Sequence, residues 1–135
     1  MSRIVIIVMA IISVLGMAGC GLYQLKTEEE QPLEYTVVSE DNLPEMLKTM
    51  IEERKQTPFQ LSYLEEDSLY MVQGYGEKET GGYDITVGKC VLAEESIHVE
   101  YNLTGPVDPK KEEAVKSYPY IVLKTERREE PVIFD

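Results

Sequence analysis

The stretch Gln73-Gly74-Tyr75-Gly76-Glu77-Lys78-Glu79-Thr80-Gly81-Gly82-Tyr83-Asp84-Ile85 lies between two runs that are typical of β-strands. It holds four of the nine glycines and two of the nine tyrosines of the chain. Glycines this close together predict a sharp turn with positive φ at one or more positions. Phosphate-loop and dinucleotide-loop patterns both fail here, because the other required residues are absent and a strand, not a helix, is predicted to follow. The stretch therefore predicts a strand–turn–strand feature.

The sequence after this turn continues with strand patterns. Ile97, Val99, Tyr101 and Leu103 alternate with polar residues, which predicts a half-buried antiparallel strand. Gly88 predicts a β-bulge in the preceding strand, because the apolar phase changes at that position. The expected strands, mostly joined by hairpins, are residues 34–39, 69–75, 83–92, 97–103, 118–124 and 131–134.

Before the strands, residues 43–51 have the spacing of an amphipathic helix. The expected buried stripe comprises Leu43, Met46, Leu47, Met50 and Ile51. Asp41 or Asn42 would cap its N-terminus, with Pro44 in the first turn. The predicted fold class is therefore α+β: a mostly antiparallel β-sheet of about six strands, forming a compact sandwich or barrel-like unit, with one amphipathic helix packed on it.

Residues 1–19 have the pattern of a secretory signal peptide, with one basic residue, an apolar run and small residues at the end. The segment Met17-Ala18-Gly19-Cys20 resembles the bacterial lipobox, which implies lipidation of Cys20 by palmitate or a similar acyl chain. A single N-terminal transmembrane anchor is the alternative, because Ile4–Leu22 is about long enough to span a bilayer. Both alternatives place the remaining chain on the extracytoplasmic face of the cell membrane, since Arg3 flanks the apolar run on the inner side.

The rest of the chain divides into a tether and a domain. Residues 20–33 are polar and acidic, as expected of a short tether, and residues 34–135 form the domain. The formal net charge of the chain is −12, and the part after residue 19 carries 12 basic and 25 acidic residues. Such a surface repels phosphate backbones and anionic lipid headgroups, so nucleic-acid binding and electrostatic membrane binding are excluded.

Residues for catalysis or metal binding are scarce. The chain has one histidine and two cysteines, which cannot form a zinc or iron–sulfur site. Strand alternation places His98 on the polar face of its strand, and Cys90 lies in an apolar run typical of a buried, inert thiol. The sequence therefore predicts no enzymatic activity, no metal and no cofactor.

Residues 76–85, 117–124 and 131–134 resemble the C-terminal domain of the PrcB family. The resemblance spans about residues 35–134, and Thr80-Gly81-Gly82-Tyr83 is its most specific element. It implies a lipid-anchored accessory protein that associates with a secreted subtilisin-like protease complex and stabilises it. The expected partners are therefore the lipid bilayer, through the anchor, and an exported protease or another envelope protein.

Tyrosine is enriched at binding hot spots, so the glycine stretch is the candidate contact surface. The candidate residues are Tyr75, Glu77, Lys78, Glu79, Thr80, Gly81, Gly82 and Tyr83. The alternative for Tyr83 is a core position, with the two preceding glycines only making the turn. Two further functions stay open: a protease inhibitor, because the loop resembles the Thr-Thr-Gly-Tyr loop of chagasin-type inhibitors, and a small enzyme acting on cell-envelope glycans.

Overall fold

A computed structural model describes residues 30–135, so the predicted signal peptide and Cys20 lie outside the described residues. Residues Gln31–Asp135 form one compact unit. This unit begins three residues before the predicted domain boundary at residue 34, because Gln31 and Pro32 already pair with a strand of the domain. Among residues 30–135, no helix is both long and apolar enough to cross a membrane.

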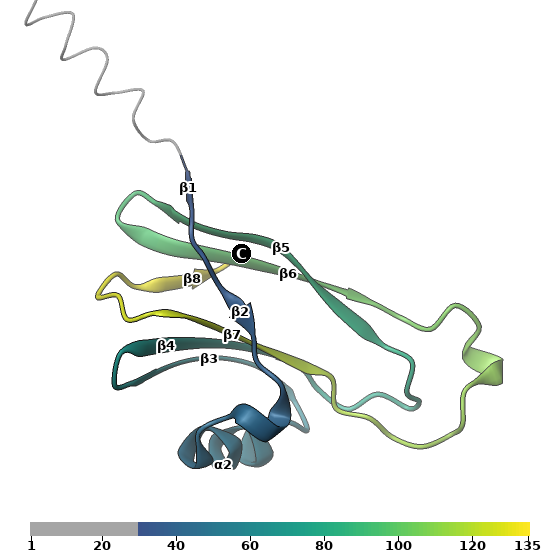
Figure 1. Cartoon of the computed structure of the whole chain (residues 1–135). Coiled ribbons are helices and arrows are strands. Elements are labelled where there is room, and N and C mark those ends of the chain that lie inside the picture. The colour runs from purple at the N-terminus through teal and green to yellow at the C-terminus, as the bar shows by residue number, and fades with distance from the viewer. Residues whose placement is uncertain (1–29) are drawn as a thin grey trace, which may run out of the picture. The chain divides into compact units, whose positions relative to one another are not determined.

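Two four-stranded sheets form this unit (Figure 1). The strands are β1 (Gln31–Pro32), β2 (Thr36–Val37), β3 (Pro58–Glu65), β4 (Ser68–Tyr75), β5 (Asp84–Ala93), β6 (Ser96–Thr104), β7 (Tyr120–Glu126) and β8 (Val132–Phe134). The first sheet has the order β1-β5-β6-β8 and the second the order β2-β7-β4-β3. All pairings are antiparallel except that of β6 with β8, which is parallel.

The sheets face each other across an apolar core, because alternate residues of each strand point to the same side. The buried members of this core are Leu69, Met71, Cys90, Ile97, Val99, Ile121 and Leu123. Burial raises the pKa of the Cys90 thiol. The domain is thus a sandwich of two sheets.

The helix α2 (Glu45–Arg54) covers the outer face of the second sheet. This second core contains Leu43, Leu47, Ile51, Tyr70, Val72 and Val122. Tyr70 and Val72 alternate along β4 with Leu69 and Met71 of the first core, so β4 is buried on both faces.

The predicted α+β class is confirmed, but the barrel-like alternative is wrong because the strands form two open sheets. Two details of the predicted helix are also wrong. Pro44 is itself the N-cap position, after a 3₁₀ turn η1 (Glu40–Asn42), and no side chain caps the helix. Met46 is exposed, because Leu43, Leu47 and Ile51 are enough to fill the contact with the sheet.

The predicted strands have two errors at the sheet edges. The strand β3 was not predicted, and the predicted strand 34–39 contains only the two residues of β2. The predicted bulge is confirmed, since the register of β5 and β6 shifts between Val87 and Lys89. The bulge keeps Ile85, Val87 and Cys90 on the core side of β5.

Tyr101 links the two sheets through a hydrogen bond. Its hydroxyl donates to the carbonyl oxygen of Met71 at 3.0 Å. Burial raises the pKa of Tyr101, because the phenolate would be poorly solvated inside the sandwich. An ordinary tyrosine has a pKa of about 10, so the unfolded chain loses this proton at a lower pH than the folded domain. The stabilisation is therefore complete below pH ~10 and declines as the pH rises towards the folded pKa.

Tyr101→Phe is expected to lower the free energy of unfolding by about 1 kcal/mol at neutral pH, because the Met71 carbonyl loses a donor. It should also reduce the loss of stability above pH ~10. Denaturant unfolding at neutral pH and above pH ~10 measures the two effects. Tyr35→Phe, at an exposed tyrosine, is the control. An alkaline decline as steep in Tyr101→Phe as in the wild type would contradict this account.

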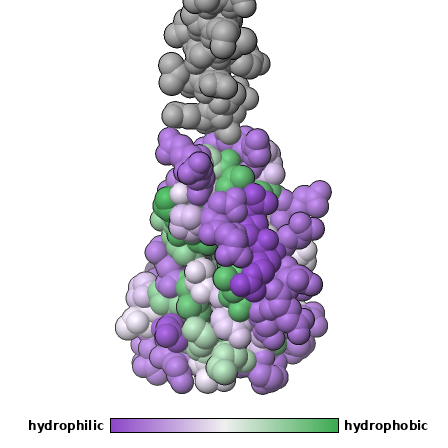
Figure 2. All heavy atoms as spheres, turned by 90° about the vertical axis from the view of Figure 1, so that its left-hand side faces the viewer, coloured by the Kyte–Doolittle hydropathy of each residue, from purple (hydrophilic) through white to green (hydrophobic). Residues whose placement is uncertain are grey.

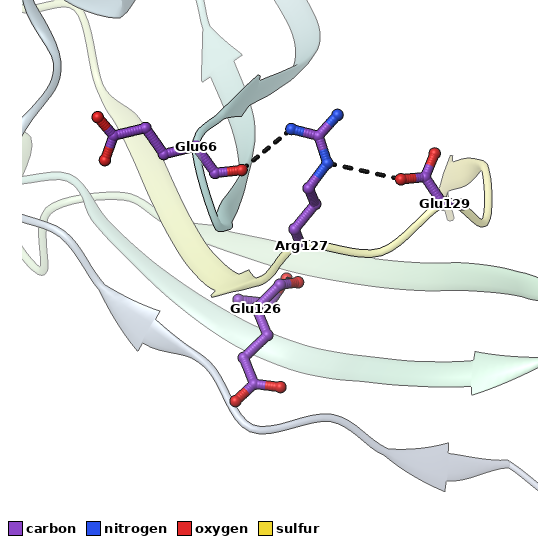
Figure 3. Close-up of polar contacts among 5 residues, drawn as sticks. Glu66, Glu126, Arg127 and Glu129 are labelled. Atoms are coloured by element: carbon purple, nitrogen blue, oxygen red, sulfur yellow. Dashed lines mark hydrogen bonds and ion pairs between the residues drawn. The ribbon is translucent and has the colours of Figure 1, made fainter.

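The turns β3–β4, β5–β6 and β7–β8 lie together at one end of the domain, which we call the hairpin end (Figure 1). Arg127 joins two of these turns. Its Nη1 donates to the carbonyl oxygen of Glu66 at 3.0 Å (Figure 3). Its backbone N–H donates to the carbonyl oxygen of Asp67 at 2.8 Å. Its Nε lies 3.5 Å from a carboxylate oxygen of Glu129. Figure 2, which faces this end, shows mainly hydrophilic surface around smaller apolar areas. The hydrogen bonds of Arg127 therefore stabilise the turns of the hairpin end.

Candidate partner-binding surface

The glycine stretch lies between two strands, as predicted, but it does not close a hairpin. It connects β4 of the second sheet to β5 of the first sheet. The chain returns from β6 to β7 through residues 105–119, which include the 3₁₀ turn η2 (Pro109–Lys111). Both connections lie at the end of the domain opposite the hairpin end (Figure 1). We call residues 76–83 and 105–119 the crossover end.

The first connection, residues 76–83, leaves the second sheet at Gly76, where a residue with a side chain would be strained. The backbone N–H of Tyr75 still donates to the carbonyl oxygen of Pro119 at 3.0 Å, and burial raises the Tyr75 pKa. Gly76 then has a φ of +79°, and a Cβ at this position would lie 2.9 Å from Cδ of Pro58. The positive φ predicted for this stretch is therefore confirmed, and it turns the chain out of the sheet.

The two connections are held together by a short antiparallel bridge. Lys78 donates its backbone N–H to the carbonyl oxygen of Ser117 at 2.8 Å, and Ser117 donates back at 3.0 Å. The Ser117 hydroxyl donates to the carbonyl oxygen of Thr80 at 2.6 Å. Three hydrogen bonds thus fix the first connection against a residue far along the chain.

Side-chain contacts add to this bridge. The carboxylate of Glu77 accepts a hydrogen bond from the Tyr118 hydroxyl at 3.1 Å and lies 3.3 Å from Nζ of Lys116. The hydrogen bond to Glu77 raises the pKa of Lys116. Lys55 of the segment after α2 lies 4.9 Å from the ring centroid of Tyr118. A polar network at the crossover end therefore connects both connections to Lys55, the residue that follows α2.

The Thr80–Tyr83 element forms the outer part of the first connection. Gly82 has a φ of +83°, whereas a Cβ on Gly81 would meet no atom within 4 Å. Tyr83 is half-buried and is not among the residues of either core. Nζ of Lys78 lies 5.8 Å from the Tyr83 ring centroid. Tyr83 therefore presents a ring at the surface beside a cation.

The predicted contact residues are contiguous in the sequence, and the structure places a second segment, residues 105–119, against them. Ser117 and Lys116 hold the first connection, and Val107 and Val115 are exposed apolar side chains on the second. A surface hollow between the connections is lined by Gly81, Glu112, Glu113, Val115, Lys116 and Ser117. One sequence signal related the two connections: Ser117-Tyr118 and the glycines belong to the same family pattern.

Ser117→Ala is expected to loosen the first connection while the rest of the domain stays folded. Loss of the hydroxyl bond to Thr80 should cost about 0.5–1.5 kcal/mol. Amide hydrogen exchange at Lys78 should become faster, with exchange in β4 and β7 unchanged. Ser62→Ala, at an exposed strand position, is the matched control. Unchanged exchange at Lys78 would show that the serine hydroxyl does not hold the connection.

Residues 69–126 match the family model described as PrcB C-terminal. This segment is therefore similar to the C-terminal domain of the PrcB family. The match confirms the predicted resemblance over a narrower range than the expected residues 35–134. The PrcB C-terminal segment begins in β4 and ends with β7, so it contains both connections of the crossover end and excludes α2 and β3. No curated protein and no solved structure matches the chain.

Proposed function

We propose that this protein is a non-catalytic, membrane-anchored extracytoplasmic subunit that binds and stabilises a secreted subtilisin-like protease. The observation that carries the proposal is the match of residues 69–126 to the PrcB C-terminal family. The matched residues supply the two central strands of the second sheet and both crossings between the sheets. The crossover end is therefore the proposed contact surface.

The position where the chain enters the domain supports this choice of surface. Gln31 pairs with Leu92, close to the β5–β6 turn at the hairpin end. The first connection reaches β5 at Asp84, eight residues from Leu92. Eight residues of strand span about 25 Å. A tether that begins before Gln31 thus joins the domain at the end away from the proposed contact surface.

The surface also has the composition of a small protein interface. Val107 is fully exposed and Val115 is 63% exposed, and both belong to the crossover end, as does the half-buried Tyr83. Apolar and aromatic side chains surrounded by charged residues are typical of interface centres with polar rims. The polar network around Glu77 would hold these groups in place before binding, which reduces the entropy lost on association.

His98 and Cys90 are the base and nucleophile candidates, and the surroundings of Cys90 support a non-catalytic role. Nδ1 of His98 lies 3.1 Å from Oδ2 of Asp135, and Nζ of Lys89 lies 3.7 Å from the same oxygen. The His98–Asp135 pair connects the residue that follows β8 with β6. Cys90 lies in the core between the sheets, where burial raises its pKa and disfavours the reactive thiolate.

Affinity capture of the full chain from envelope extracts tests the proposal. We expect recovery of an exported subtilisin-like protease and a longer active lifetime of that protease with the chain bound. Stoichiometric addition should leave protease turnover unchanged; slower turnover would instead favour the inhibitor alternative. Absence of any reproducible protein partner would contradict the proposal.

The mass of the mature N-terminus tests the anchor separately. Lipidation predicts a chain that begins at Cys20 and carries acyl groups. An unmodified chain that begins at Met1 would contradict lipidation and support the transmembrane alternative. The two tests are independent, because a protein partner can bind either form.

A further inference from the structure

The strand β3 forms one edge of the second sheet, since its only partner strand among residues 30–135 is β4 (Figure 1). It is eight residues long, whereas β2 at the other edge has two residues. A long edge strand exposes a row of unpaired backbone groups, and proteins usually protect such edges with charges, proline or a bulge.

This edge lacks most of those protections. Residues 56–64, Gln-Thr-Pro-Phe-Gln-Leu-Ser-Tyr-Leu, contain no charged side chain, and the one charged residue of β3 is Glu65 at its end. Proline occurs only at the first residue of the strand, Pro58, and the β3–β4 pairing continues without a register shift from Pro58 to Glu65. The edge is therefore able to pair with another strand.

The hydrogen-bond pattern shows which residues face outward. The backbone N–H of Tyr75 points to β7, because it donates to Pro119. Its neighbour across the ladder is Pro58, whose backbone groups must then point away from β4. Every second residue follows the same rule, so the backbone groups of Gln60, Ser62 and Leu64 also point outward.

We propose that β3 pairs with β3 of a second copy of this chain in an antiparallel, two-fold arrangement centred on Ser62. Ser62 would face Ser62 of the second copy, and Gln60 would face Leu64 of the second copy. Leu61 and Tyr63 would form cross-strand pairs on the face that α2 covers, where both side chains are half-buried in one copy. The combined sheet would contain eight strands across the two copies.

Charges at the two ends of β3 favour an antiparallel over a parallel pairing of two copies. Arg54 and Lys55 lie just before the strand and form ion pairs with Glu53 and Glu52, whereas Glu65, Glu66 and Asp67 make the other end acidic. In the antiparallel arrangement, Asp67 of one copy lies opposite Thr57 of the other, two residues from Lys55. A parallel arrangement would instead bring the two acidic turns together. The antiparallel pair separates those turns by about the length of the strand, more than 20 Å, which exceeds the screening length of ~8 Å at physiological salt.

Cysteine cross-linking of the full chain in membranes tests both the pairing and its register. Ser62→Cys is expected to yield a species of twice the chain mass with a short thiol cross-linker, because the two side chains face each other. Gln60→Cys should stay at the wild-type level, since two copies of residue 60 would lie about 13 Å apart along the strands. Mixed expression of Gln60→Cys and Leu64→Cys should restore the cross-link. The wild type, which has Cys20 and Cys90, gives the background.

Three results would overturn the proposal. They are a Ser62→Cys signal at the wild-type level, equal cross-linking of Gln60→Cys alone, and cross-linking of Ser62→Cys to a different protein. Ser62→Lys should also abolish the dimer while leaving the melting temperature of the monomer unchanged at low protein concentration, because a charge at an edge opposes pairing while Ser62 is exposed. Thr86→Lys, at an exposed position of β5, is the matched control and should leave the dimer intact.

Discussion

Gly76→Ala is expected to lower the free energy of unfolding by about 2–4 kcal/mol. Two costs add at this position. A side chain at a φ of +79° is strained, and its Cβ would lie 2.9 Å from Cδ and 3.1 Å from the backbone nitrogen of Pro58. The ring and backbone of Pro58 begin β3, so they cannot move without disturbing the edge of the sheet. Denaturant unfolding measures the loss.

Gly81→Ala is the matched control in the same connection. A Cβ on Gly81 meets no atom within 4 Å, and no positive φ is required there. Its effect should therefore stay within about 0.5 kcal/mol. Equal losses for the two variants would show that Gly76 has no special role in turning the chain between the sheets.

Leu123→Ala is expected to destabilise the domain by about 2–5 kcal/mol, since it removes a large buried side chain and leaves a cavity. Leu123 is fully buried and lies on β7 in the core between the sheets. Thermal and denaturant unfolding measure the effect. Leu64→Ala, at a leucine that is 42% exposed on β3, should cost much less. A loss at Leu123 no larger than at Leu64 would contradict the assignment of the main core.

The features that the sequence predicted well are those set by local periodicity. Ile97 and Val99 are buried and belong to the main core, as their alternation with polar residues indicated. The bulge at Gly88 followed from a change of apolar phase, which is also a local signal. Local patterns of this kind depend on which face of a strand is buried, and that information is present in neighbouring residues.

Most features that the sequence did not predict depend on contacts between residues far apart in the chain. Nothing near Gly76 indicates whether β5 pairs with β4 or joins the opposite sheet, so the sequence predicts a turn between two strands but not the sheet that each strand joins. The bond between Lys78 and Ser117 has no local signal, because the two residues are 39 positions apart. The strand β3 is an exception, because Phe59, Leu61 and Tyr63 alternate with Gln60 and Ser62, and this local pattern is typical of a half-buried strand.

The central claim is that the crossover end contacts a protein partner. Affinity capture with Val107→Asp combined with Val115→Asp tests it most directly, because both side chains are exposed and the variant should remain folded. Val37→Asp, at an exposed position of β2, is the control for an added charge elsewhere. We expect the double variant to lose the captured protease and Val37→Asp to retain it. Full retention by the double variant, with its melting temperature unchanged, would contradict the claim.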